Sequence, residues 1–203
     1  MSPNDTRRLE AVRTLLSKNG ITLDALYDVR RANMKQPYHN EQHLFIVTLA
    51  SAAGAEYYDL TPRQKRVLVL AALYHDYNHT GKIGVPDSVN IELAVEGVEN
   101  FLRLEGYTSI THKDADAVKA LIHATLHPNK KRPASISEAI IRDADMMEWF
   151  EPDAEELLVG LNEELKPDSP FTMKTTEAFL RKHSFLTQWG MNLFQETFPF
   201  TRG

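Results

Sequence analysis

Residues 70–79 read Leu-Ala-Ala-Leu-Tyr-His-Asp-Tyr-Asn-His, so that an apolar run ends in a histidine and an aspartate, His75 and Asp76. The run begins at Val67, and its length and flanking residues predict a buried central helix, with a buried strand as the alternative. Aspartate is seldom fully buried unless it is paired or bound to a metal. A hydrogen bond between the two side chains would explain the pattern, and so would a metal site.

More candidate ligands lie on both sides of this stretch. His39 and His43 precede it, and Asp143 and Asp145 follow it. His39 and His43 are four residues apart, so they share a helix face if both are helical, and one could bind a metal while the other faces a substrate. Three separated helices would then supply imidazole and carboxylate groups, a suitable shell for a catalytic divalent metal. Helix-end histidines bonded to carbonyl groups are the structural alternative.

The two aspartates are two residues apart, so on a helix they point in different directions and only one should reach the metal. We expect Asp145 to be the ligand, because small and apolar residues surround it. Asp143 would then cap a helix or pair with Arg142. Both could also be ordinary surface carboxylates.

Three further histidines are candidates for other parts of a site. His79 follows His75 by four residues, and His123 and His127 are also four residues apart. We expect His123 and His127 either to serve a second ion or a phosphate, or to form a polar patch near a helix end.

Composition narrows the class of protein. The 203 residues suit one domain or one domain with extensions, the formal net charge is −5, and the chain has no cysteine. Cysteine ligands, cysteine nucleophiles and disulfides are therefore excluded, and a large nucleic-acid surface is not expected. No apolar stretch reaches the length of a membrane span, and the N-terminus lacks the features of a signal peptide. We expect a cytoplasmic protein with no membrane contact.

Helical periodicity dominates the chain, and no run of alternating residues predicts a sheet, so the expected fold class is all-α. Capping signals mark several helix starts: Thr61 with Gln64, Thr111 with Asp114, and Ser135 with Glu138. Residues 154–165 should form one helix, and residues 172–198 a single long final helix.

The order His43, His75-Asp76, Asp145 resembles that of the HD superfamily of metal-dependent phosphohydrolases. Within it, Tyr38-His39-Asn40-x-x-His43 and His75-Asp76-x-x-His79-x-Gly81 are similar to the signatures of class I cyclic-nucleotide phosphodiesterases. The resemblance covers roughly residues 36–150. It implies a helical-bundle core over 36–150, an N-terminal helical extension over 1–35, and C-terminal helices over 151–203 that pack on the core.

The resemblance also implies roles for single residues. His43, His75, Asp76 and Asp145 would hold the first metal, and Asp76 would bridge to a second ion. His39 would be the general acid that protonates the leaving oxygen, and His79 would lie near the second metal. The family fixes neither the number of ions, one or two, nor their identity among Mn, Fe, Co, Ni, Zn and Mg.

Departures from the phosphodiesterases leave the substrate open. The phosphodiesterases are longer and hold the base with a glutamine, for which Gln188 is a candidate here. Asn90 with Glu92 is similar to an Asn-Glu pair of short HD proteins, and we take Asn90 and Lys82 as candidate substrate contacts. We expect a small, nucleotide-like phosphate ester.

Several other functions remain alternatives. The superfamily also contains nucleoside 5′-mono- and triphosphate hydrolases, and di-iron oxygenases with further histidine ligands. A module that binds a nucleotide without turning it over is the alternative outside enzymes. The triphosphate hydrolases continue His-Asp-x-x-His with Pro-Phe, where this chain has Thr80 and Gly81, and the 5′-deoxynucleotidases have glutamate where His79 stands.

Overall fold

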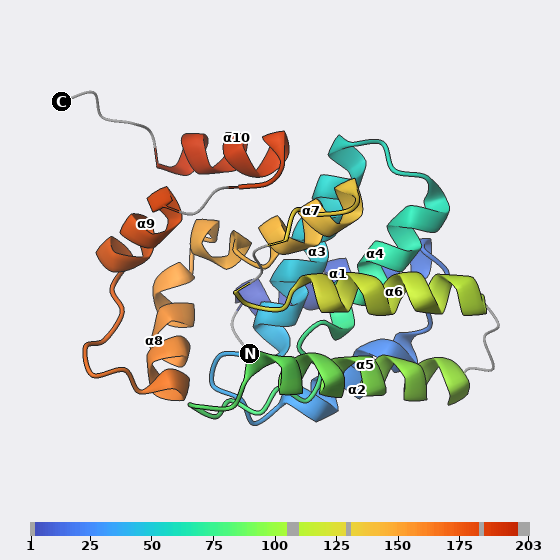
Figure 1. Cartoon of the computed structure of the whole chain (residues 1–203), viewed down its shortest axis with the longest axis horizontal. Helices are drawn as coiled ribbons and strands as arrows, with labels where there is room; N and C mark the ends of the chain where they lie inside the picture. Colours follow the sequence, from blue (N-terminus) through green and yellow to red (C-terminus); the bar gives the residue numbers. More distant parts are fainter. Residues whose placement is uncertain (1–2, 105–109, 129–130, 183–184, 199–203) are drawn as a thin grey trace.

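The computed structural model describes residues 3–104, 110–128, 131–182 and 185–198, and over these residues the chain is all-α, as predicted (Figure 1). The elements in chain order are α1 (Pro3–Lys18), α2 (Leu23–Asn33), α3 (Glu41–Tyr57), α4 (Pro62–Tyr74), α5 (Asp87–Leu104), α6 (His112–Ala124), α7 (Ile136–Ala144), the 3-10 helix η1 (Met147–Phe150), α8 (Ala154–Leu165), α9 (Met173–Lys182) and α10 (Gln188–Thr197). No strand occurs among these residues.

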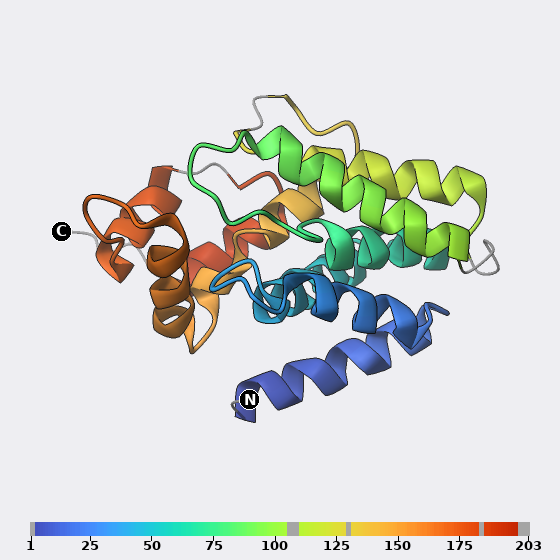
Figure 2. The same ribbon diagram turned by 90° about the horizontal axis from the view of Figure 1, so that it is seen from below.

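Helix α4 is the centre of the bundle. Every residue from Val67 to Tyr74 is buried, which confirms the buried helix and rules out the strand. The helix packs against α3, α5, α6 and α7, and the pair α5 and α6 lies side by side in both views (Figures 1 and 2). Because α4 is enclosed in this way, the residues that follow Tyr74 emerge in the interior of the protein.

Capping explains where several helices begin. Thr61 and Gln64 form a capping box at α4, and Thr111 and Asp114 form another at α6, as predicted. Ser135 accepts a hydrogen bond from the Glu138 backbone N–H, but the Glu138 carboxylate accepts from the backbone of Ala134 rather than from Ser135. The third predicted capping box is therefore only half formed.

The prediction of one long final helix is wrong. Helix α9 ends at Lys182 and α10 begins at Gln188, and residues 183 and 184 lie outside the described residues. The buried carboxylate of Asp143 accepts hydrogen bonds from the backbone N–H groups of Leu186 and Thr187, at 2.9 and 2.8 Å. Those two donors would bond within a continuous helix, so Asp143 stabilises a break that local sequence does not reveal.

The C-terminal helices close one end of the bundle. Helices α8 and α9 lie at one side of the bundle in Figure 1, and α8 packs against η1. Helix α8 packs closely against the loop before α3 at Gly160, where a Cβ atom would lie 2.4 Å from the carbonyl oxygen of Pro37. Arg8 of α1 makes a bidentate ion pair with Asp153, which precedes α8, at 2.6 and 2.7 Å, and it donates a hydrogen bond to Glu151 at 2.7 Å. Of the described helices, none combines the length and apolarity needed to cross a bilayer.

Candidate metal centre

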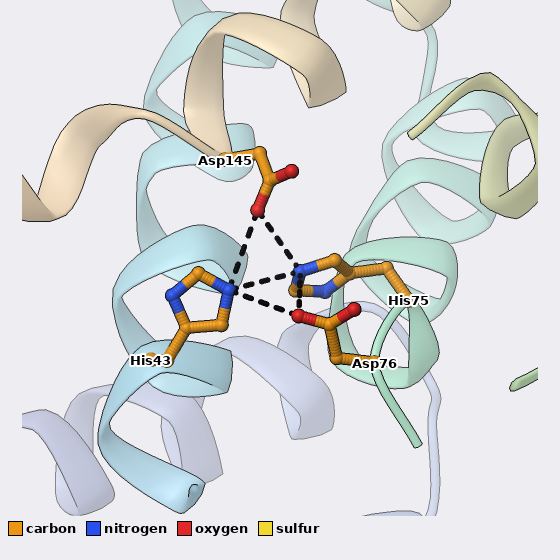
Figure 3. A group of neighbouring side chains, drawn as sticks. All are labelled: His43, His75, Asp76 and Asp145. Atoms are coloured by element: carbon orange, nitrogen blue, oxygen red, sulfur yellow. Dashed lines mark hydrogen bonds and ion pairs between the residues drawn. The ribbon is translucent and has the colours of Figure 1, made fainter. Parts of the chain in front are cut away.

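Four side chains from three helices meet where α4 ends (Figure 3). His43 comes from the first turn of α3, His75 is the C-cap of α4 and Asp76 follows it, and Asp145 is the C-cap of α7. Nε2 of His43 lies 3.2 Å from Nε2 of His75 and 3.1 Å from Oδ2 of Asp76. Oδ1 of Asp145 lies 3.3 Å from Nε2 of His43 and 3.2 Å from Nε2 of His75. The predicted set is thus brought together.

These separations fit the edges of a coordination shell. Nitrogen and oxygen ligands lie about 2.0–2.2 Å from an ion such as zinc, which places neighbouring ligands of a tetrahedron about 3.4 Å apart. The observed separations of 3.1 to 3.3 Å are close to that value. Two imidazole and two carboxylate groups also form a donor set that suits several first-row divalent ions. The residues present therefore fit a divalent cation.

The neighbours of both rings turn Nε2 toward the cluster. Nδ1 of His75 is 2.8 Å from the carbonyl oxygen of Ala72, so Nδ1 donates to that carbonyl and Nε2 faces the cluster. Nδ1 of His43 is 3.2 Å from Oε2 of Glu148, at an angle too poor for a hydrogen bond. Glu148 also accepts a hydrogen bond from the hydroxyl of Tyr38. Nε2 of each ring, 3.2 Å from the other, is therefore the atom that would bind a cation once it has lost its proton.

The charges in the cluster are strongly interdependent. Burial alone would lower the pKa of His75, but Asp76 and Asp145 together raise it to about 10. Burial likewise opposes ionisation of Asp145, whereas contacts with His43 and His75 hold the pKa of that carboxyl well below its usual range. Without a cation the rings therefore retain protons, which a metal would have to displace.

A second group of potential ligands adjoins the first: His39, Asp76 and His79. His39 precedes Asn40, the N-cap of α3, so it is not helical. The condition under which His39 and His43 would share a helix face is therefore not met. The ring of His39 still lies 5.7 Å from that of His43, between centroids, and its Nε2 is 3.9 Å from Oδ2 of Asp76. The ring of His79 stacks on it with centroids 3.5 Å apart.

Glu164, on α8, holds His39 in place. Its carboxylate accepts hydrogen bonds from the backbone N–H groups of Tyr38 and His39, at 2.9 and 3.1 Å, and bonds to Nδ1 of His39. Burial of Glu164 opposes its ionisation, but these hydrogen bonds and the charge of His39 lower its pKa to about 2. Glu164 is therefore ionised at neutral pH, and Nε2 of His39 is left to face the cluster.

His79 is held as a neutral ring. Burial and the neighbouring His39 lower its pKa to about 4. The backbone N–H of Gly81 donates to Nδ1 of His79 at 3.1 Å, so the ring proton resides on Nε2. His79 can thus donate a hydrogen bond, whereas a ligand to an ion would need a free lone pair.

Side-chain amides join the segments that carry these side chains. Nδ2 of Asn33, at the end of α2, donates to the carbonyl oxygens of His39 and Asp76, at 2.7 Å each. Oδ1 of Asn33 accepts from the backbone of Asn78 at 3.0 Å, and Gln36 donates to the carbonyl of His79 at 2.5 Å. These contacts fix the loop before α3 against the turn after α4.

A cavity of about 750 Å³ opens beside both groups. The predicted substrate residues Lys82 and Asn90 line it, as does His127. Asn90 is buried and its Oδ1 accepts hydrogen bonds from the backbone and hydroxyl of Thr80, so it shapes the loop. His123 is exposed on α6 and is not a lining residue, while His127 lies beyond the end of that helix. The two histidines thus do not share a helix face, and the structure gives no support for a joint ion or phosphate site.

Sequence reasoning missed Glu148, Glu164 and Asn33. None of them stands at a recognisable spacing from the motif residues, and each reaches the site through a contact between distant segments. The only local signal was weak: Glu148 follows the predicted ligand Asp145 by three residues in a largely apolar stretch.

Comparison with known proteins gives no assignment. No family model, no curated protein and no solved structure matches the chain.

Proposed function

We propose that this chain is a metal-dependent phosphohydrolase with an HD-type site, in which His43, His75, Asp76 and Asp145 hold a divalent cation. The observation that carries the proposal is the ligand-like spacing of these four side chains beside an imidazole that is held by a buried carboxylate, His39 with Glu164. The cluster opens into a cavity of ligand size, which gives a phosphate ester access to it.

The chain's own residues would divide the reaction between them. A divalent ion bound at the cluster supplies a water of lowered pKa and positive charge that stabilises the phosphoryl oxygens. As the bond between phosphorus and the leaving oxygen breaks, His39 donates the proton on Nε2 to that oxygen. Glu164 bonds to Nδ1, so it keeps the ring oriented and stabilises its protonated form. The Nε2–H of neutral His79 is available to hydrogen-bond the bound anion.

The charge of the cavity favours an ester of low charge over a triphosphate. Four carboxylates line it, those of Asp76, Asp87, Asp145 and Glu148, and among the described lining residues Lys82 is the only lysine and there is no arginine. One or two divalent ions would offset two to four of these negative charges, which leaves little positive charge for a triphosphate. A phosphodiester or a monoester matches this balance better.

Metal analysis and a hydrolysis screen test the proposal. The purified chain should retain stoichiometric metal, lose it to a chelator, and hydrolyse nucleotides, cyclic nucleotides, dinucleotides or bis(p-nitrophenyl) phosphate after addition of Mn, Co, Ni, Mg or Zn. His75→Ala should remove both properties, because its ring is fully buried and faces two carboxylates. A protein that binds no metal, or one that His75→Ala leaves unchanged, would refute the site.

The same preparation separates the alternatives. Oxygen consumption by an iron-loaded sample would indicate an oxygenase, in which a second ion at the adjoining group would have to displace the Nε2 proton of His79. Tight nucleotide binding without any product would indicate a sensor module. Either result would replace hydrolysis as the function of this site.

A further inference from the structure

Part of the cavity lining is apolar, and we call this part the outer wall. One side of it belongs to the loop before α5 and the other to α8, α9 and the segment between them; together they contribute Ile83, Val85, Leu161, Leu165, Phe171 and Phe179. Phe171 and Phe179 keep 39% and 46% of their surface exposed. Two half-exposed aromatic rings that line the cavity of a metal cluster offer a contact surface for an apolar group.

Hydrogen bonds fix the part of the wall that α8, α9 and the segment between them form. Asn162 of α8 accepts from the backbone N–H of Phe171 at 2.7 Å and donates to its carbonyl oxygen at 2.9 Å. Thr172 and Thr175 cap the start of α9, with the Thr175 backbone N–H donating to the Thr172 hydroxyl at 3.2 Å. The backbone at Phe171 is thus fixed against α8 before any ligand binds.

Amide groups that could read the edge of a base are missing from the described lining. The one lining asparagine, Asn90, is engaged with Thr80 and lies 3.4 Å from Asp87. Gln188, the candidate base-binding glutamine of the sequence analysis, lies on α10, donates to Asn192 at 2.7 Å, and does not line the cavity. The described lining thus offers no free side-chain amide to a base, and the apolar wall is a surface that can contact the organic part of a substrate.

We propose that the outer wall around Phe171 and Phe179 binds an aromatic group of a singly charged phosphate ester, and that it selects for a ring without distinguishing one base from another. This inference rests on the proposed function, which places the phosphate at the cluster. The occupant is an aromatic ring because the wall presents two phenyl side chains, and aromatic pairs gain energy beyond the area they bury. The cavity of about 750 Å³ is of the size that holds a nucleotide-sized ligand.

A pair of phosphonate esters with a poor leaving group, methoxide, tests the wall separately from catalysis. Methyl phenylphosphonate and methyl methylphosphonate carry the same single charge and differ only in the phenyl ring. Calorimetric titration of the metal-loaded protein should show the phenyl compound binding roughly tenfold more tightly, as expected for burial of one ring. Phe171→Ala should remove most of this preference and leave the affinity for the methyl compound unchanged.

Matched variants guard against a folding effect. Tyr27→Ala removes an aromatic side chain of similar exposure, 50%, on α2 and away from the cavity, so it should keep the preference. Phe179→Ala provides a second test of the wall, and thermal melts check that each variant is folded. A phenyl preference that both wall variants retain would overturn the inference.

The outcomes distinguish this inference from the proposed function. If the methyl compound binds and the phenyl ring adds nothing, the wall proposal fails while the metal-dependent site stands. If neither compound binds the metal-loaded protein, the placement of the phosphate fails and the inference fails with it. Among active substrates, the cyclic monophosphates of adenosine, guanosine, cytidine and uridine should differ by less than roughly tenfold in kcat/KM, and a preference of 10⁴-fold, the size that hydrogen-bond readout of a substrate gives, would contradict the proposal.

Discussion

Glu164 of α8 accepts a hydrogen bond from the backbone N–H of His39 at 3.1 Å and also bonds to Nδ1 of the same residue. The two residues are 125 positions apart in the chain. The ring that would protonate the leaving group is therefore positioned by a C-terminal helix, while the cluster it serves is built from α3, α4 and α7. The proposed acid and the proposed metal site can for this reason be disturbed independently.

His39→Ala should keep the metal and lower kcat by roughly 10²–10⁴-fold, the usual size of a general acid contribution. His39 is not among the four side chains of the main cluster, so their spacing should persist. The loss should be smaller for nitrophenyl esters, whose leaving groups need little protonation. Metal content and kcat across a series of leaving groups check this. Equal losses for good and poor leaving groups would argue against the acid role, and loss of metal would make His39 a ligand.

Glu164→Gln should resemble His39→Ala in milder form. The amide can still accept from the two backbone N–H groups, but it carries no charge to stabilise the protonated ring. We expect kcat to fall by roughly 10²-fold, comparable with the effect of small misplacements of catalytic groups, with metal content unchanged. Glu163→Gln, at the exposed neighbouring position, is the control and should behave as the wild type. If Glu164→Gln alters only stability, and not the dependence on the leaving group, it has no positioning role.

Asp145→Asn and Asp143→Asn should separate metal binding from folding. Asp145 contacts both cluster histidines, so its variant should lose the metal. Asp143 bonds instead to Leu186 and Thr187, so its variant should keep the metal and unfold at a lower temperature, with a cost of about 1 kcal/mol for the weakened hydrogen bonds. Elemental analysis and thermal melts of both proteins decide. The reverse pattern of metal loss would move the ligand to Asp143.

The ion pair between Arg8 and Asp153 should make stability depend on pH. Hydrogen bonds from Arg8 lower the pKa of Asp153 despite its burial, so folding favours the ionised carboxylate. This contribution is present above the unfolded pKa of about 3.9 and is lost as the pH falls through the lower folded pKa.

Urea unfolding of the wild type and Asp153→Asn at several pH values measures this contribution. At pH 7 the wild type should be more stable by about 2 kcal/mol, the usual worth of hydrogen bonds to charged groups. The gap should close as the medium becomes more acidic than pH 4. Asp168→Asn, in an exposed loop, should show no such gap. A difference in stability that is constant from pH 7 to pH 2 would show that the charge of Asp153 is not its cause.

The sequence predicts the centre of this site better than its surroundings. An apolar helix that ends in His75 and Asp76 can be recognised from local pattern alone, because burial of such a helix forces the next two residues inward. The position of Asp145 followed from its neighbours. By contrast, Asn33 was placed in an N-terminal extension, yet its buried amide joins the carbonyl groups of His39 and Asp76.

The wrong prediction of the final helix and the contacts that the sequence did not reveal have the same physical origin. Residues 172–198 have the periodicity of one helix, but the carboxylate of Asp143, more than 40 positions earlier, favours the break between α9 and α10. His123 and His127 have helical spacing, but the helix ends between them. Contacts that depend on how helices pack leave no trace in the spacing of residues, so they appear only in the folded chain.

The close approach of α8 to the loop before α3 depends on the absence of a side chain at Gly160. A methyl group there would collide with the carbonyl oxygen of Pro37, and α8 would have to withdraw from the loop that carries His39. Glu164 lies one turn further along the same helix, so it would be carried away from the imidazole. A Gly160→Ala substitution, the smallest possible addition of a side chain, would then impair proton donation by His39, although residue 160 is not among the proposed metal ligands and does not line the cavity.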